Sequence, residues 1–174
     1  MPASVSAGSF ADVACAIAGD PAAVEWALVL SAALGATVIR PRADRMNAYH
    51  AGAVLAGNGI AALLDASLTL MEHAGLGREA ARQALAPLMR TALENALAQG
   101  PERSATGPVV RGDVVTVDTH LDALRAGGDL PLSLYRAVSL HLIELARRRG
   151  LATESLAALT TAVDAAESPR EHDV

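Results

Sequence analysis

The sequence contains no lysine, so all 14 of its basic residues are arginine. A lysine Schiff base, a lysine general acid and the lysine of a phosphate-binding loop are therefore excluded. The single cysteine, Cys15, excludes an internal disulfide and a cysteine-rich metal site, and it is typical of a reducing compartment. The N-terminus shows no basic segment followed by an apolar core, so we expect no signal peptide and a cytoplasmic location.

Aromatic residues make up only 2% of the chain, although 52% of it is hydrophobic. A core of Ala, Leu and Val favours closely packed helices over an aromatic-rich β-sandwich, and 174 residues correspond to about one domain. The net charge of -5 gives a mildly acidic surface. Its one dense basic cluster, Arg147 to Arg149, stands where a helix is predicted to end, and cations there complement the helix dipole. We therefore expect no nucleic-acid partner.

The first 42 residues are typical of a strand, a helix and a second strand. Val13 to Ala18 form a short apolar run, Asp20 followed by Pro21 predicts a helix start, and Gly35 predicts its end. Ala36 to Ile39 predict the second strand. This pattern is one crossover of a parallel sheet, and two strands alone cannot bury both of their faces.

After Pro41 the pattern is helical. We predict a long helix from a cap near Asp44 to Gly75 or Gly77, followed by four further helices. The first two of these are Arg78–Gln99 and a helix that is capped by Asp113 and ends at Gly127. The last two are Leu132–Arg149, which follows Pro131, and a helix that is capped by Thr153. Their expected inner faces are Leu85, Leu88, Ala92 and Ala96; Val117, Leu121 and Leu124; Leu134, Val138, Leu142 and Leu145; and Leu156, Leu159 and Val163. We thus expect a mainly α chain, with a helical domain over residues 43–167 and a flexible tail over 168–174.

The segment Ala51 to Met71 has 21 residues and one charge, close to the length that spans a bilayer. Its first half is Ala and Gly, and Asn58 and Asp65 would face lipid, so we expect no membrane partner. A helix that is apolar on all sides predicts a buried central helix, wrapped by its neighbours or by a second subunit.

Gly57 to Ala62 match the dinucleotide fingerprint G-x-G-x-x-A. The fingerprint requires a strand before its first glycine, whereas here a capped helical run continues through it. Small residues that let another helix approach closely explain these glycines with fewer assumptions.

Polar residues gather at the start of the same helix. His50 and Asn58 lie at steps of four on one face, with Asn47 a turn earlier, and Arg45 and Tyr49 form a second stripe beside them. The alternative is that His50 is a hydrogen-bonded core histidine. The clustering favours a lined cleft.

A second polar cluster contains Thr106, Arg111, Asp113 and His120. Thr106 stands at a tight Gly-Pro turn, Arg111 offers a fork suited to carboxylate or phosphate, and Asp113 predicts a helix N-terminus that attracts anions. Gly107-Pro108 as a plain loop and Asp113 as a plain cap are equally good explanations of those residues. Hydrolase and metal-enzyme motifs such as GxSxG, HExxH and CxxC do not occur, and we expect no metal site.

Three blocks carry a resemblance: Arg45 to Asn58, Thr106 to Leu124, and Leu134 to Ala137. They resemble the C-terminal helical domain, itself a domain of unknown function, of a family of two-domain NADP-dependent oxidoreductases. That domain is similar to the helical domains of 6-phosphogluconate dehydrogenase, pyrroline-5-carboxylate reductase and ketopantoate reductase. The resemblance extends from about Phe10 to Val163.

The resemblance implies a helical bundle of the 6-phosphogluconate dehydrogenase C-terminal type that dimerises and closes a substrate cleft. Residues 1–42 would be the last β-α-β of a Rossmann domain, whose NADP- or NAD-binding loop would precede residue 1. His50 would exchange a proton beside hydride transfer and Asn58 would orient a small carbonyl or imine substrate. Arg45, Asn47, Tyr49, Thr106, Arg111, Asp113 and His120 would line the substrate site.

Three functions are therefore open. The chain is the substrate-binding and dimerisation domain of an NAD(P)-dependent oxidoreductase that needs its Rossmann domain for catalysis, a non-catalytic homodimerisation or interaction module, or a stand-alone small-molecule binding protein.

Overall fold

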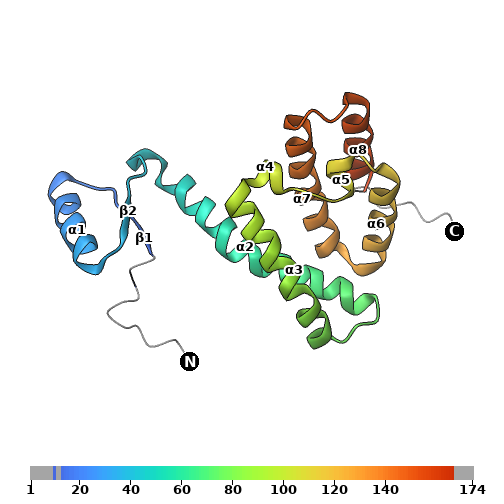
Figure 1. The fold of residues 1–174 in the computed structure, drawn as a ribbon, viewed down its shortest axis with the longest axis horizontal. Coiled ribbons are helices and arrows are strands. Elements are labelled where there is room, and N and C mark those ends of the chain that lie inside the picture. The colour runs from blue at the N-terminus through green and yellow to red at the C-terminus, as the bar shows by residue number, and fades with distance from the viewer. Residues whose placement is uncertain (1–9, 11–12, 167–174) are drawn as a thin grey trace. The chain divides into compact units, whose positions relative to one another are not determined.

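The computed structural model describes residues 10 and 13–166, and the chain forms two compact units, residues 1–60 and 61–174. The first unit contains strand β1 (Ala14–Ala16), helix α1 (Pro21–Leu34), strand β2 (Thr37–Ile39), a 3-10 turn (Ala43–Arg45) and the start of helix α2 (Met46–His73). Figure 1 shows these elements in blue to cyan. The second unit contains the rest of α2 and the six helices that follow it.

The first unit has the predicted strand-helix-strand order, with strands of three residues each. β1 and β2 pair in parallel, with Cys15 opposite Val38. Asp20 caps α1 by accepting a hydrogen bond from the Ala23 amide at 3.0 Å. Gly35 ends α1 in a left-handed conformation with φ 71°, which costs glycine little.

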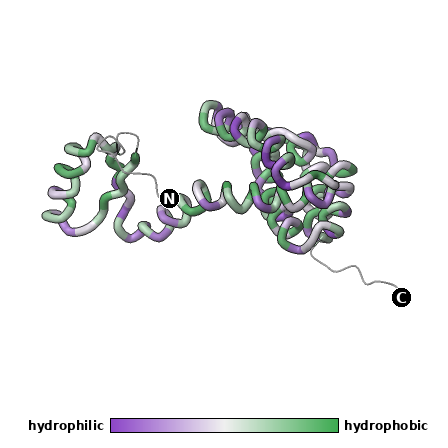
Figure 2. Tube along the Cα trace, turned by 90° about the horizontal axis from the view of Figure 1, so that it is seen from below, coloured by the Kyte–Doolittle hydropathy of each residue, from purple (hydrophilic) through white to green (hydrophobic). Residues whose placement is uncertain are grey.

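Helix α2 crosses the boundary between the two units without a break. Leu68 is its only buried residue, so the prediction of a helix wrapped by its neighbours within the chain is wrong. The physical reason is that few side chains of the described structure cover it. Figure 2 shows hydrophobic and polar residues alternating along its exposed part. By length and composition, Ala43–His73 would suffice to cross a membrane, and only 6% of its most apolar window is buried.

The second unit is helical throughout. After α2 come α3 (Arg78–Gln99), α4 (Pro101–Ser104), α5 (Pro108–Arg111), α6 (Val114–Gly127), α7 (Asp129–Arg148) and α8 (Thr153–Ala165). Helices α5 to α8 pack together around one core (Figure 1). Val117, Leu121, Leu159 and Val163 form its centre, each with at most 1% of its surface exposed. The predicted inner faces of α6 and α8 are thus confirmed, except that Leu156 is half-buried.

The predicted inner face of α7 is wrong by about one residue. Its buried residues are Pro131, Ser139, Ile143 and Ala146, whereas Val138 is 37% exposed. α7 contacts α4, α5, α6 and α8, so its buried surface is set by these four neighbours rather than by its leucines. The helix also begins at Asp129, three residues before the predicted start.

Helix α3 has the predicted bounds, but only its first half is covered. Ala81 and Leu85 pack with Leu68 of α2 in a small second core. Leu88 is 64% exposed, against its prediction as an inner-face residue, because the described structure offers this stretch no packing partner. Two predicted caps are also shifted: Thr153 is the first residue of α8 rather than its cap, and Asp44 lies in the 3-10 turn before α2.

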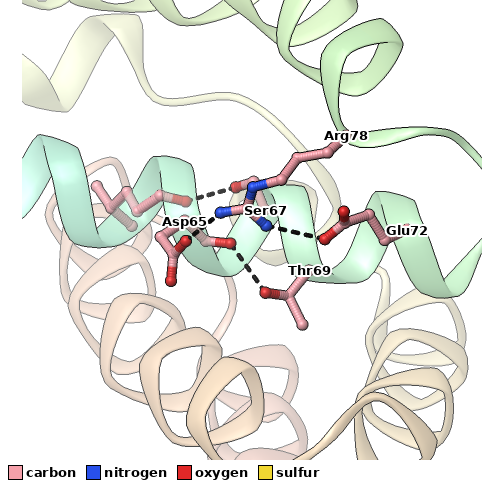
Figure 3. A network of polar contacts seen from close by, with 6 residues as sticks. Asp65, Ser67, Thr69, Glu72 and Arg78 are labelled. Atoms are coloured by element: carbon pink, nitrogen blue, oxygen red, sulfur yellow. Dashed lines mark hydrogen bonds and ion pairs between the residues drawn. The ribbon is translucent and has the colours of Figure 1, made fainter.

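Arginine side chains form hydrogen bonds near the ends of two of these helices. Arg78, at the start of α3, donates to Asp65 at 2.5 Å and to Glu72 at 2.8 Å, both on α2 (Figure 3). Arg149, just after α7, donates to the carbonyl oxygen of Ala105 at 2.7 Å. The arginine cluster therefore lies at a helix C-terminus, as predicted, and part of it serves internal contacts.

Candidate functional site

A small polar hollow lies in the second unit, where α5, α6 and α7 meet the turn before α5. Its volume is about 130 Å³, room for roughly four water molecules. Its polar lining is Thr106, His120, Tyr135 and Ser139, and its apolar lining is Pro108, Val109, Val138 and Leu142. We call it the polar hollow.

His120 and Tyr135 form a pair at this hollow. The Nδ1 atom of His120 on α6 lies 3.0 Å from the hydroxyl oxygen of Tyr135 on α7. The two rings meet edge to face, with centroids 5.9 Å apart and an interplanar angle of 84°. The sequence separation is 15 residues, so the contact depends on the packing of α6 against α7.

The side chain of Ser139 also hydrogen-bonds to Tyr135. It lies one turn after Tyr135 on α7, and only 1% of its surface is exposed. Burial raises the pKa of Tyr135, and a hydrogen bond between the two side chains opposes this shift only in part, so the phenol keeps its proton at neutral pH. The hydrogen bond with Ser139 lowers the pKa of Tyr135, which is the effect of a serine hydroxyl that donates to the phenol oxygen.

The direction of the hydrogen bond between His120 and Tyr135 depends on the tautomer of the imidazole, and one direction agrees with the contact to Ser139. Since its oxygen accepts from Ser139, the Tyr135 hydroxyl can place its own proton on Nδ1 of His120. A neutral imidazole that accepts at Nδ1 carries its proton on Nε2. In that tautomer the exposed His120 carries an N–H donor at Nε2, while its Nδ1 contacts the half-buried Tyr135.

Asp113 fixes the start of α6 close to this pair. Its carboxylate accepts from the backbone amide of Thr116 at 3.1 Å and from the Thr116 hydroxyl at 2.7 Å. The hydrogen bonds from Thr116 lower the pKa of Asp113, and the attraction of Arg111 and His120 adds to the effect. Asp113 is therefore ionised near neutral pH and is confirmed as a helix cap.

The predicted site residues fall into both units. Thr106 and His120 line the polar hollow. Arg111 and Asp113 lie between them in the sequence, and the carboxylate of Asp113 is attracted by Arg111 and His120. In the first unit, Asn47, His50 and Asn58 are exposed on α2 and Tyr49 is half-buried. Arg45 is exposed and lies 3.6 Å from the carboxylate of Asp44.

Sequence reasoning missed Tyr135 and Ser139 as site residues. A signal was present, because the two lie at i and i+4 on a helix that is otherwise apolar on that side. Tyrosine and serine buried there need hydrogen-bond partners, which His120 supplies from α6.

The described residues do not fit a nicotinamide cofactor through the fingerprint-like stretch. Gly57 and Gly59 lie in the interior of α2, with no strand before them, which confirms the dismissal of that match. A Cβ at either glycine would meet nothing within 4 Å, so no helix of the described chain approaches them. Within residues 10 and 13–166, no group of three or more His, Cys, Asp or Glu could hold a metal ion.

Comparison with known proteins gives one match. A family model described as "Domain of unknown function (DUF2520)" matches residues 13–142. No curated protein and no solved structure matches the chain.

Proposed function

The chain belongs to the family described as a domain of unknown function, DUF2520, and we propose that it is the substrate-binding and dimerisation domain of an NAD(P)-dependent oxidoreductase. The substrate is a small carbonyl or imine compound, and its polar group binds in the polar hollow. The observation that carries this proposal is the row of side chains Ser139, Tyr135 and His120, from the buried serine to the exposed imidazole, at a hollow of about 130 Å³.

The chemistry of the hollow supports a carbonyl or imine. Nε2–H of His120 and the hydroxyl of Thr106 are donors suited to a carbonyl oxygen or a carboxylate, whereas the apolar lining fits the carbon skeleton. The Tyr135 hydroxyl lies 3.0 Å from Nδ1 of His120, and a side chain held by such a neighbour is what a binding site requires.

His50 and Asn58 keep their proposed roles as proton donor and orienting amide. Their support is the helix spacing of four and the resemblance to the oxidoreductase helical domains. Both side chains are exposed, and they belong to the first unit, whereas the polar hollow belongs to the second. Because the described residues do not form a cofactor loop, the nucleotide-binding domain would be supplied in cis or in trans.

The exposed apolar surface of α2 supports dimerisation. Leu55 is 75% exposed, and Val54, Ile60 and Leu63 are each 40% exposed. These exposed apolar side chains are distributed around α2, and a second copy of α2 would cover part of them. The same observation favours the second candidate function, a homodimerisation module without catalysis.

The substrate proposal is tested by nuclear magnetic resonance on the 174-residue chain. Pyruvate and 1-pyrroline, a small 2-oxo acid and a small cyclic imine, are titrated while the imidazole signals are followed. We expect saturable shifts of the His120 Nε2–H signal, weakened in Thr106→Val and retained in the control Tyr49→Phe. Absence of saturable shifts with both probes contradicts the proposal.

A calorimetric titration tests the placement of the cofactor. NADPH titrated into this chain is expected to give no binding heat, because the chain lacks a fitting loop. Tight binding would contradict a cofactor site outside residues 1–174.

A further inference from the structure

An apolar trough lies between α2 and α7, beside the polar hollow. Its walls are four residues of α2 between Ala62 and Thr69 and five residues of α7 between Leu130 and Ala137. Its volume is about 570 Å³, within the roughly 300–1,000 Å³ typical of small-molecule sites. Alanines at positions 62, 66 and 137 leave this space, because larger side chains there would fill it.

The trough continues into the polar hollow. A smaller hollow of about 110 Å³ shares Ala66, Pro131 and Leu134 with the trough. It shares Tyr135 and Val138 with the polar hollow. The three spaces therefore follow one another along α7, and Tyr135 stands where the apolar part meets the polar part.

The polar groups along the trough already have partners. Asp65 is held by Arg78, as Figure 3 shows, and the hydroxyl of Thr69 donates to the carbonyl oxygen of Asp65 at 3.1 Å. Ser133 donates in the same way to the carbonyl oxygen of Leu130 at 3.0 Å. Since these hydroxyl protons are used within the helices, the trough presents mainly carbon to an occupant.

We propose that the trough binds the apolar body of the substrate whose carbonyl or imine group lies at His120 and Tyr135. The substrate class is then an amphipathic carbonyl or imine compound with an unbranched or weakly branched hydrocarbon part, rather than a compact, fully polar one. This inference rests on the proposed function, because it takes the polar hollow as the site of the reacting group. The inference goes beyond the proposed function because it assigns substrate selection to α2 and the start of α7.

A chain-length series tests the trough. Straight-chain 2-oxo acids from 2-oxobutanoate to 2-oxooctanoate are titrated calorimetrically into the 174-residue chain, below their micelle concentrations. A fully buried methylene tightens Kd by about fourfold. Because the trough is partly open, we expect Kd to tighten by about tenfold or more over the four added methylenes.

Variants separate the trough from the polar hollow. Ala137→Trp, at an exposed position on the wall, is expected to remove the dependence on chain length and to leave 2-oxobutanoate binding unchanged. Ala66→Leu gives a second, smaller obstruction should the tryptophan disturb folding. Ala157→Trp on α8, exposed and away from the trough, is the matched control and should keep the full dependence. Tyr135→Phe should weaken all members of the series by a similar factor.

The outcomes distinguish the two proposals. Equal affinity for short and long acids, with binding lost in Tyr135→Phe, overturns the trough and leaves the proposed function standing. Chain-length dependence that is insensitive to Tyr135→Phe overturns the polar hollow as the site of the reacting group. No binding by any member overturns both. If Ala137→Trp lowers the particle mass in light scattering, the trough is an interface between copies and the inference fails.

Discussion

The Nδ1 atom of His120 lies 3.0 Å from the hydroxyl oxygen of Tyr135, and the two rings meet edge to face. This contact joins α6 to α7 at the polar hollow and leaves the second imidazole nitrogen toward the exposed side. If the half-buried tyrosine donates to Nδ1, the imidazole carries its proton on Nε2 and can bind a hydrogen-bond acceptor there.

The tautomer of His120 is directly testable. In the wild-type chain, nitrogen NMR at pH 8 should show the neutral Nε2–H form of His120. Tyr135→Phe removes the donor to Nδ1 and should give a mixture of tautomers. The control Tyr49→Phe changes the only other tyrosine, on α2, and should leave His120 as in wild type. A dominant Nδ1–H form in wild type would contradict the assigned pair.

The ionisation of Tyr135 gives a second test. Burial raises its pKa above 10.0, because the phenolate is the charged form. In Tyr49→Phe, absorbance near 295 nm reports Tyr135 alone, and its midpoint is expected above pH 10.0. Tyr135→Phe assigns the remaining signal. A Tyr135 midpoint at or below 10.0 would show that the ring is not buried in solution.

The core of α5 to α8 should be sensitive to truncation. Leu121 is 1% exposed, and Leu121→Ala removes buried carbon and leaves a cavity, so the free energy of unfolding should fall by about 2–5 kcal/mol. Leu97→Ala on α3, where the side chain is 78% exposed, is the matched control and should change stability by less than about 0.5 kcal/mol. Urea denaturation measures both, and equal losses would contradict the burial.

Two glycines should respond oppositely to alanine. At Gly112, φ is 75° and an added Cβ would lie 3.2 Å from both Leu151 and Ser155, so Gly112→Ala should destabilise by about 1–2 kcal/mol. Gly57 lies inside α2 with nothing within 4 Å, and Gly57→Ala should stabilise by about 0.5–1 kcal/mol. If Gly57→Ala destabilises instead, a partner packs closely on that glycine.

Acid stability should depend on Glu144. Hydrogen bonds from Arg147, then from Arg148, lower its pKa from 4.5 to about 2. The ionised carboxylate is therefore favoured in the folded state, its contribution is complete above pH 4.5, and it disappears as the pH falls to about 2. Because the group is exposed, Glu144→Gln should lower Tm by about 1–3 °C at pH 6.

At pH 2 the Tm difference between wild type and Glu144→Gln should vanish. Glu154→Gln, an exposed control on α8, should show no comparable dependence on pH. A difference that persists undiminished to pH 2 would mean that the carboxylate charge is not its cause.

The exposed apolar side chains of α2 predict a dimer in solution. Sedimentation at micromolar concentration should give twice the chain mass of 17.8 kDa. Leu55→Glu places a charge at a side chain that is 75% exposed in the single chain, and it should weaken dimerisation by about tenfold or more. Val115→Glu on α6, with 78% exposure, is the control. A wild-type mass of 17.8 kDa would contradict the dimer.

Much of the helical architecture could be predicted because its signals are local. Asp20 and Asp113 are confirmed as caps by their hydrogen bonds, and the bounds of α3 match the prediction. The buried face of α7 could not be predicted, since four neighbouring helices determine it and Ser139 is buried in place of a leucine. Periodicity identifies a helix but does not say how many partners it has.

The candidate site was predicted in part. Thr106 was singled out for its place at the Gly-Pro turn and His120 because packing does not explain it, and both line one hollow. Tyr135 joins them through a contact between two helices, which the order of residues does not display. The roles of His50, Asn58, Arg45, Asn47, Tyr49 and Arg111 stay predictions.

Helix α2 runs unbroken through the boundary at Ile60 and Ala61, which has a practical consequence for anyone dissecting or evolving this chain. Proteases cut most readily at exposed loop tips, so they should not release the two units at this point. A single inserted residue would shift the helical phase by about 100°, whereas loop linkers tolerate such changes. Insertions and exchanges between related chains are therefore expected before Met46 rather than inside α2.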